Sequence, residues 1–301
     1  MQTLLPSPET DPACCRNYRI AGLTLRVTAD LPLDSAAFEE KFSCFQTDEP
    51  GNDVIYLHHH FFIPDMRDEN PGRMVFRKGP WTIYQRDSTW IYHAPTLGQL
   101  AVCNKTHTRC AMYHEPQEAD RIGHDTLSLL PSDQILLARL LPERQACLIH
   151  AAGMALAGQG LLFLGHSGAG KSTVAQLLAR RGTVLCDDRI IVRRWPEGLR
   201  IHGTWFHSAG VPLVSPADAP LRALLLLEKS DANRLEPVRD RAELARTLPL
   251  FIIKSLLTAD WWEKVFDLMT RVIREVPAYR LYFDTSGSVA AALEPLLQEG
   301  G

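Results

Sequence analysis

The glycine-rich segment in the middle of the chain constrains the fold more than any other feature. It matches the pattern GxxxxGK[ST] in full and reads Gly165, His166, Ser167, Gly168, Ala169, Gly170, Lys171 and Ser172. It lies between the short apolar run 160–164 and a stretch from Lys171 to Arg181 with helical character. This order predicts a phosphate-binding loop, because small residues let backbone N–H groups surround phosphate oxygens and the helix N-terminus adds positive charge. The alternative, a chance glycine turn, is disfavoured by the flanking strand and helix.

The loop residues have distinct expected roles. We expect Lys171 to reach the β- and γ-phosphates of bound ATP and the Ser172 hydroxyl to bind Mg²⁺. With Thr173, the predicted nucleotide-binding set covers residues 165–173.

Two adjacent acids, Asp187 and Asp188, follow the next buried strand, 183–186. In phosphate-loop folds an acid at this strand end holds Mg²⁺, and a second acid is suited to accept a proton from an attacking hydroxyl. A turn or a helix cap is the structural alternative. We interpret the pair as part of the phosphate site and leave open which acid has which role.

His150 lies at the end of a strand that precedes the loop. A single histidine is more often structural than catalytic, so its position alone does not assign it a function.

The chain divides into two parts that differ in their pattern of apolar residues. Residues 1–16 have the composition of a flexible tail, and residues 17–130 contain short alternating runs that predict a β-rich domain, mainly an antiparallel meander. Residues 131–301 begin with a helical segment and continue with buried strands and amphipathic helices. We therefore expect an α/β catalytic domain after a β-rich N-terminal domain that recognises the substrate.

Charge and composition exclude several classes of protein. Lys plus Arg number 32 and Asp plus Glu 35, so the net charge is −3, without the basic field of a dedicated nucleic-acid binder. No apolar run approaches the roughly 20 residues of a membrane helix, and the N-terminus lacks the regions of a signal peptide. The 7 cysteines are irregularly spaced and form no CxxC, so we expect a reducing, cytoplasmic setting in which most of them act as small apolar residues.

Residues 147–188 resemble the catalytic domain of HPr serine kinase/phosphorylase. The resemblance rests on His150, the segment from Gly158 through the loop, the pair Arg181–Gly182, and Asp187–Asp188. It implies a phosphoenolpyruvate-carboxykinase-like fold and transfer of the γ-phosphoryl group of ATP to a serine hydroxyl. It also implies that Asp187 accepts the proton, that Asp188 lies near the metal and that His150 lies near the transferring phosphate.

One motif of that family is absent. Where the bifunctional enzymes have Glu-x-Arg-Gly, this chain has Arg200, Ile201, His202 and Gly203. The segment 201–205 is instead similar to HPr-kinase-related proteins found beside peptide-modification genes, some of which phosphorylate small precursor peptides, including lasso peptides. This resemblance implies a kinase of a Ser/Thr hydroxyl on a peptide or protein, and the bifunctional relatives make a homo-oligomer possible.

Three weaker signals complete the candidates. His202 and His207 flank a segment that is either a loop beside the phosphates or a buried loop with polar anchors, and Glu228 is either a second metal acid or a surface carboxylate. In the run 58–60 only His58 and His60 share a strand face, and two ligands without a nearby acid are too few for zinc.

Other functions remain possible at this point. They are a kinase of a small molecule, a nucleotide sensor that transfers nothing, and an NTPase subunit, although the further motifs of the last class are not identifiable. The intact acid pair favours a kinase, because a pure binding protein needs no base.

Overall fold

The computed structural model describes residues 14–32, 40–66, 70–116, 126–128, 133–208, 213–254 and 258–298. The chain forms two compact units, Met1–Leu140 and Leu141–Gly301. The division falls after the helix α2 (Gln134–Leu140), whereas the sequence suggested a boundary before it. Among the helices of the described residues, none has the length and apolar character that a membrane crossing requires.

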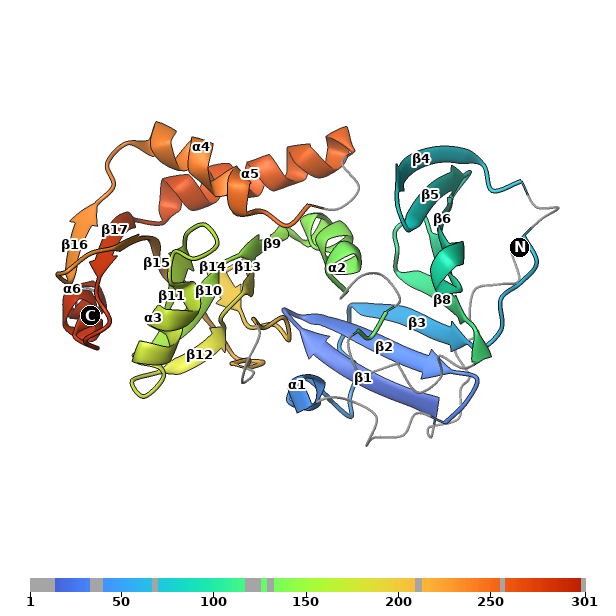
Figure 1. Cartoon of the computed structure of the whole chain (residues 1–301), viewed down its shortest axis with the longest axis horizontal. Helices are drawn as coiled ribbons and strands as arrows, with labels where there is room; N and C mark the ends of the chain where they lie inside the picture. The colour runs from blue at the N-terminus through green and yellow to red at the C-terminus, as the bar shows by residue number, and fades with distance from the viewer. Residues whose placement is uncertain are drawn as a thin grey trace. The chain divides into compact units, whose positions relative to one another are not determined.

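The first unit is built on an 8-stranded sheet with the order β1-β2-β3-β8-β7-β6-β5-β4 (Figure 1). Its described helices are the short α1 (Glu40–Ser43) and α2, with a 3-10 turn at Pro95–Leu97. The strands are β1 (Cys15–Ile20), β2 (Leu23–Ala29), β3 (Val54–His60), β4 (Arg73–Lys78), β5 (Trp81–Arg86), β6 (Thr89–Ala94), β7 (Gln99–Asn104) and β8 (Arg109–His114).

Most of this sheet is the predicted meander, because β4 to β8 pair antiparallel in chain order. β3 differs, since it runs parallel to both of its neighbours, β2 and β8. A parallel pair needs a connection longer than a tight hairpin turn, and β2 ends at Ala29 whereas β3 begins at Val54. The sheet is therefore mixed, and short-range turn signals did not reveal it.

A disulfide joins Cys103 and Cys110, which lie opposite each other in the register of β7 and β8. We expected a reducing setting in which most cysteines act as small apolar residues, and this disulfide is an exception to that expectation. The pairing arises from the hairpin between the two strands rather than from a recognisable cysteine framework. The other cysteines, Cys14, Cys15, Cys44, Cys147 and Cys186, are free.

The second unit contains a 9-stranded sheet with the path β12-β10-β11-β15-β14-β13-β9, and β17 pairs with both β15 and β16. β11 and β17 run parallel to β15 on its two sides. The strands are β9 (Ala146–His150), β10 (Ala152–Leu156), β11 (Gln159–Leu164), β12 (Thr183–Cys186), β13 (Arg189–Trp195), β14 (Gly198–His202), β15 (Asp218–Lys229), β16 (Arg234–Pro237) and β17 (Ala278–Phe283).

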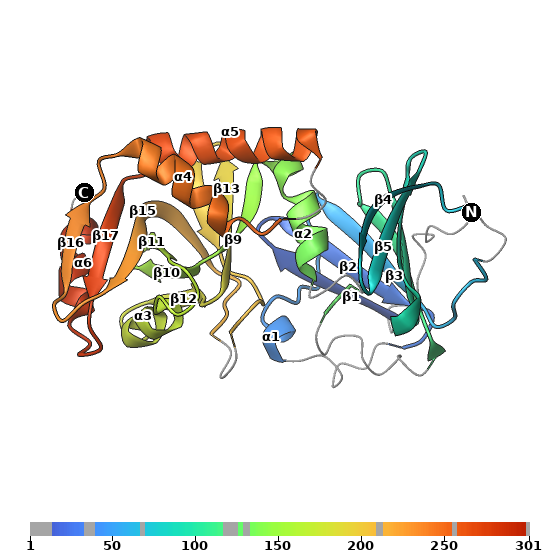
Figure 2. The same ribbon diagram turned by 45° about the horizontal axis from the view of Figure 1, so that its top comes forward.

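Helices cover both faces of this sheet (Figure 2). Along β11, Leu162 and Leu164 pack with α4 (Arg241–Phe251) and α5 (Ala259–Glu275). Leu161 and Phe163 alternate with them and pack with α3 (Lys171–Leu178) and α6 (Val289–Gln298). A strand that is buried on both faces reads as an unbroken apolar run, as the sequence predicted for 160–164.

Two elements of the second unit had no clear sequence signal. Strand β16 is short and mostly exposed, so it lacks an apolar pattern. Helix α4 contains Pro249, which obscures the helical period, but Asp240 caps its start by accepting a hydrogen bond from the Ala242 N–H at 2.8 Å.

Candidate functional site

The glycine-rich segment forms a loop between the end of β11 and the start of α3, as predicted. Gly168 and Gly170 have φ angles of 80° and 98°, a region that favours glycine. A Cβ on Gly170 would lie 2.5 Å from Cζ of Phe283. The sequence therefore places glycine where the backbone must turn tightly before the helix begins.

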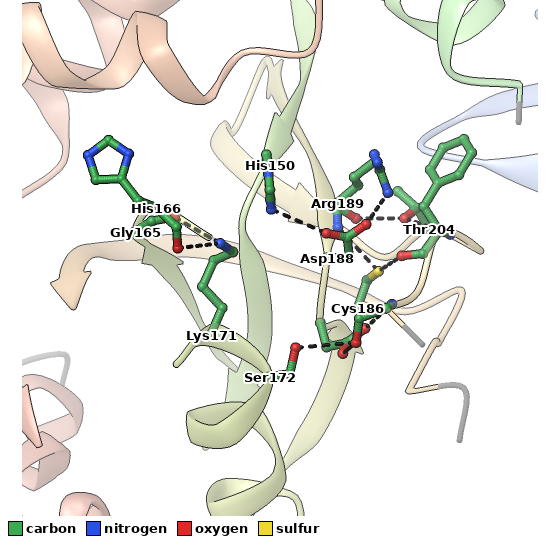
Figure 3. A network of polar contacts seen from close by, with 12 residues as sticks. His150, Gly165, His166, Lys171, Ser172, Cys186, Asp188, Arg189 and Thr204 are labelled. Atoms are coloured by element: carbon green, nitrogen blue, oxygen red, sulfur yellow. Dashed lines mark hydrogen bonds and ion pairs between the residues drawn. The ribbon is translucent and has the colours of Figure 1, made fainter. Parts of the chain in front are cut away.

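The ammonium group of Lys171 lies inside this loop (Figure 3). Its Nζ donates to the carbonyl oxygens of Gly165 at 2.8 Å and His166 at 3.2 Å. Burial lowers the pKa of Lys171 from its usual value, and the negative charge of Asp188 opposes that shift. These two carbonyl groups hold the lysine at the loop. The oxygens of a bound phosphate would compete with them for the same ammonium group.

Asp187 is connected to the start of α3 through Ser208. The carboxylate of Asp187 accepts hydrogen bonds from the backbone N–H of Ser208 at 3.1 Å and from its hydroxyl. The same hydroxyl lies 3.3 Å from the hydroxyl of Ser172. Asp187 is only 4% exposed, so this chain of contacts fixes its orientation.

Asp188 has different partners from Asp187, because it pairs with His150 and Arg189 (Figure 3). The register of β9 and β13 places His150 opposite Arg189, and the Nε2 atom of His150 lies 3.3 Å from Oδ1 of Asp188. Burial and the positive charge of Lys171 lower the pKa of His150, while Asp188 opposes this. His150 and Arg189 therefore flank the same carboxylate.

The turn that carries the two acids is braced by the segment 203–208. The Cys186 thiol donates to the Phe206 carbonyl, and the Thr204 hydroxyl donates to the Arg189 carbonyl at 2.6 Å. Burial raises the pKa of Cys186 to about 11, so this thiol is structural rather than reactive. A Cβ on Gly203 would come within 1.8 Å of the Ser215 carbonyl oxygen, which explains the glycine at that position.

A cavity of about 480 Å³ lies beside the phosphate loop. The loop residues 165–169, the end of β15 and the α4 side chains Glu243, Thr247 and Phe251 line it. Arg280 also lines the cavity and pairs with Glu243. Its size falls in the range of small-molecule binding sites.

The structure brings together the phosphate loop, Asp187, Asp188 and His150, and Thr173 lies in the first turn of α3. Of the weaker candidates, His202 accepts a hydrogen bond from Nε1 of Trp195 at 3.0 Å. Glu228 lines the cavity beside Arg280.

Sequence reasoning missed two residues of the site. Ser208 follows the flagged His207, yet its own residue type carries no motif, and only the fold brings it to Asp187. Arg189 directly follows the acid pair, and that adjacency was the available signal.

The oxygen donors near the loop suit a magnesium ion. Ser172, Asp187 and Asp188 offer a hydroxyl and carboxylates, which are the hard ligands that Mg²⁺ prefers. The residues present therefore fit the implied metal.

Comparisons with known proteins identify the family. Residues 125–298 match the family described as SynChlorMet cassette protein ScmC, and the chain belongs to this family. No curated protein matches the chain. Among solved structures, the Hpr(Ser) kinase/phosphatase from Coxiella burnetii is a weak structural neighbour. It has 12% sequence identity and a TM-score of 0.30, over 50% of this chain and 88% of that chain.

Proposed function

We propose that the chain is an ATP-dependent kinase that transfers the γ-phosphoryl group to a Ser/Thr hydroxyl of a peptide or protein. The observation that carries this proposal is the convergence of Lys171, the acid pair and His150 around one phosphate-binding loop. A protein that only binds nucleotide does not need two carboxylates and a histidine beside the phosphates.

In this proposal the phosphates and the nucleoside part of ATP bind at two adjacent places. The phosphates bind the loop amides and Lys171, and the base and ribose occupy the adjacent cavity. His166 and Phe251 contribute aromatic surface there, with ring centroids 5.6 Å apart, and Glu243 offers hydrogen-bond acceptors.

In the transfer, the substrate oxygen forms a bond to the γ-phosphorus while the bond from that phosphorus to the β-bridging oxygen breaks and ADP leaves. The proton of the substrate hydroxyl passes to a carboxylate of the acid pair. Lys171 and the loop amides stabilise the charge that develops on the phosphoryl oxygens. Bound Mg²⁺ would supply further charge neutralisation.

The two carboxylates divide two roles between them, proton acceptance and metal binding. The family resemblance implies that Asp187 is the proton acceptor and Asp188 the metal-side acid. The contacts favour the opposite division, because Asp187 is linked through Ser208 to Ser172, the residue expected on the metal. Asp188 instead lies against His150, which the resemblance places near the transferring phosphate.

The acceptor class comes from the resemblance to kinases of small precursor peptides, the lasso-peptide type included. We therefore propose a ribosomally made precursor peptide as the substrate. The β-rich first unit is the proposed recognition part.

The test is tandem mass spectrometry of small peptides encoded beside the gene, after incubation with the full chain, Mg²⁺ and ATP. We expect one phosphoryl group on a Ser or Thr side chain, absent with Lys171→Ala and retained with Lys264→Ala, a surface lysine of the same unit. ATP binding by calorimetry without any peptide phosphorylation would contradict the peptide substrate and favour a small-molecule kinase or a nucleotide sensor.

A further inference from the structure

The three consecutive histidines at the end of β3 face two sides of the first sheet. Burial alternates along the strand, so His59 is buried while His58 and His60 share the opposite face. We expected no metal there, because the sequence places no acid near the two histidines. The structure supplies one: Asp30 follows β2, and its backbone N–H bonds to the His59 carbonyl at 3.0 Å, which extends the β2–β3 pairing.

The carboxylate of Asp30 lies between the two imidazole rings. Its Oδ1 is 3.0 Å from Nε2 of His58, and its Oδ2 is 2.9 Å from Nδ1 of His60. The three potential ligand atoms lie within 4.8 Å of one another. Ligands about 2.1 Å from a shared ion are separated by about 3.0–3.4 Å, so small side-chain adjustments would suffice to bind one.

The three side chains are partly exposed to solvent, and the ring of His60 is held in place by packing. The side chains of His58, His60 and Asp30 are 12%, 20% and 42% exposed, so an ion can enter from solvent. The ring of His60 stacks on Tyr113 with centroids 4.8 Å apart and planes at 18°. This packing fixes the direction in which the imidazole points.

A second set of contacts supports His58 as a metal ligand. Its other ring nitrogen, Nδ1, is 2.7 Å from the Thr28 hydroxyl, which in turn lies 3.3 Å from the Leu57 carbonyl. With Nε2 bound to an ion, Nδ1–H donates to the Thr28 oxygen and the Thr28 hydroxyl donates to Leu57. Such hydrogen bonds orient ligating histidines in metal sites.

We propose that Asp30, His58 and His60 form a binding site for a divalent transition-metal ion, with Zn²⁺ the best match to the donors. Two imidazoles and one carboxylate are a three-ligand set that leaves the ion a position open to solvent or to a further ligand. The proposal is independent of the phosphate site in the second unit.

The alternative is a hydrogen-bonded trio without an ion, in which each imidazole donates one N–H to Asp30. Calorimetric titration of the metal-free full chain with ZnCl₂ separates the two. The variants are Asp30→Asn, His60→Gln and Thr28→Val, and His93→Gln replaces a histidine of the same sheet outside the cluster.

We expect a zinc equivalent that is lost or weakened at least about tenfold in Asp30→Asn and His60→Gln. Thr28→Val, which replaces the hydroxyl with a methyl group of similar size, should weaken it about 10- to 100-fold. His93→Gln should bind as the unaltered protein does. Unchanged zinc binding in Asp30→Asn and His60→Gln, or no binding by the unaltered protein, would overturn the proposal.

The melting temperature of each variant provides the folding control. Zinc should raise it for the unaltered chain and for His93→Gln, because an ion that binds the folded state stabilises it by mass action. It should leave His60→Gln unchanged. Equal stabilisation of His60→Gln would also contradict the site.

Discussion

The two units of the chain use their buried polar side chains differently. In the first unit two pairs of them contact each other: His59 and His114 share a hydrogen bond of 2.8 Å, and His107 lies 2.6 Å from the Tyr92 hydroxyl. In the second unit, Lys171 and Asp187 converge at strand ends beside a loop that borders a cavity. Polar groups of the first kind hold a fold together, whereas those of the second kind are the groups that we propose bind the nucleotide.

The largest expected effect comes from removing one carboxylate of the second unit. Asp188→Asn should lower phosphoryl transfer by about 10²-fold or more, the usual size of an acid–base contribution, while ATP binding remains. Initial transfer rates and calorimetry measure the two effects. If Asp187→Asn alone shows this pattern, the roles are those that the resemblance implied; if neither variant loses activity, the acid pair has no part in the chemistry.

The second prediction concerns the conformation of the loop. Gly170→Ala places a Cβ at a φ of 98° and against the Phe283 ring, so it should lower transfer by about tenfold or more, from about 1–2 kcal/mol of backbone strain. Gly287→Ala is the matched control, because its φ is 85° and the space around it is open. Equal transfer by both variants would show that the loop geometry is not required.

The third prediction concerns acid stability. Burial lowers the pKa of His114 to about 4 and of His107 to about 3, while the unfolded chain has a histidine pKa near about 6.5. Below about pH 6.5 the unfolded state binds protons that the folded state does not, so stability is full above that pH and falls as the pH decreases toward about 4. Each such histidine lowers the free energy of unfolding by up to about 1.4 kcal/mol for each pH unit of acidification in this window.

Chemical denaturation between about pH 7.5 and 4.5 measures this slope. His114→Gln should flatten it. A slope that His114→Gln leaves unchanged would contradict the account of the first unit.

The smallest expected effect is at the start of α4, the helix that lines the cavity. Asp240→Ala removes the side chain that accepts from the Ala242 N–H and should cost about 1 kcal/mol of stability. Asp231→Ala, an exposed acid outside any helix, should change stability by less. Thermal unfolding distinguishes them, and equal losses would show that the cap does not matter.

The same contrast explains what could be predicted from the sequence. The phosphate loop is contiguous, and the strand and helix that flank it are local, so residues 165–172 and the helix after them follow from pattern alone. Asp187 and Asp188 were singled out for the same reason, since they directly follow a short buried strand.

Contacts between distant segments could not be read in that way. Asp30 and His58 are 28 residues apart and meet only because β2 and β3 run parallel. No turn motif in the sequence indicates this pairing. Ser208 lies 21 residues after Asp187, and the β13–β14 hairpin between them brings the chain back to the acid. Cys103 meets Cys110 through strand register. These positions depend on the sheet as a whole and not on any local pattern.

The most direct test of the central claim is the rate of γ-phosphoryl transfer by the unaltered chain, Lys171→Ala and Lys264→Ala at saturating Mg²⁺ and ATP. The account predicts a loss of about 10²-fold or more for Lys171→Ala, because its ammonium stabilises the developing phosphoryl charge, and a near-normal rate for Lys264→Ala. Near-normal transfer by Lys171→Ala would show that the loop is not the phosphoryl-transfer site.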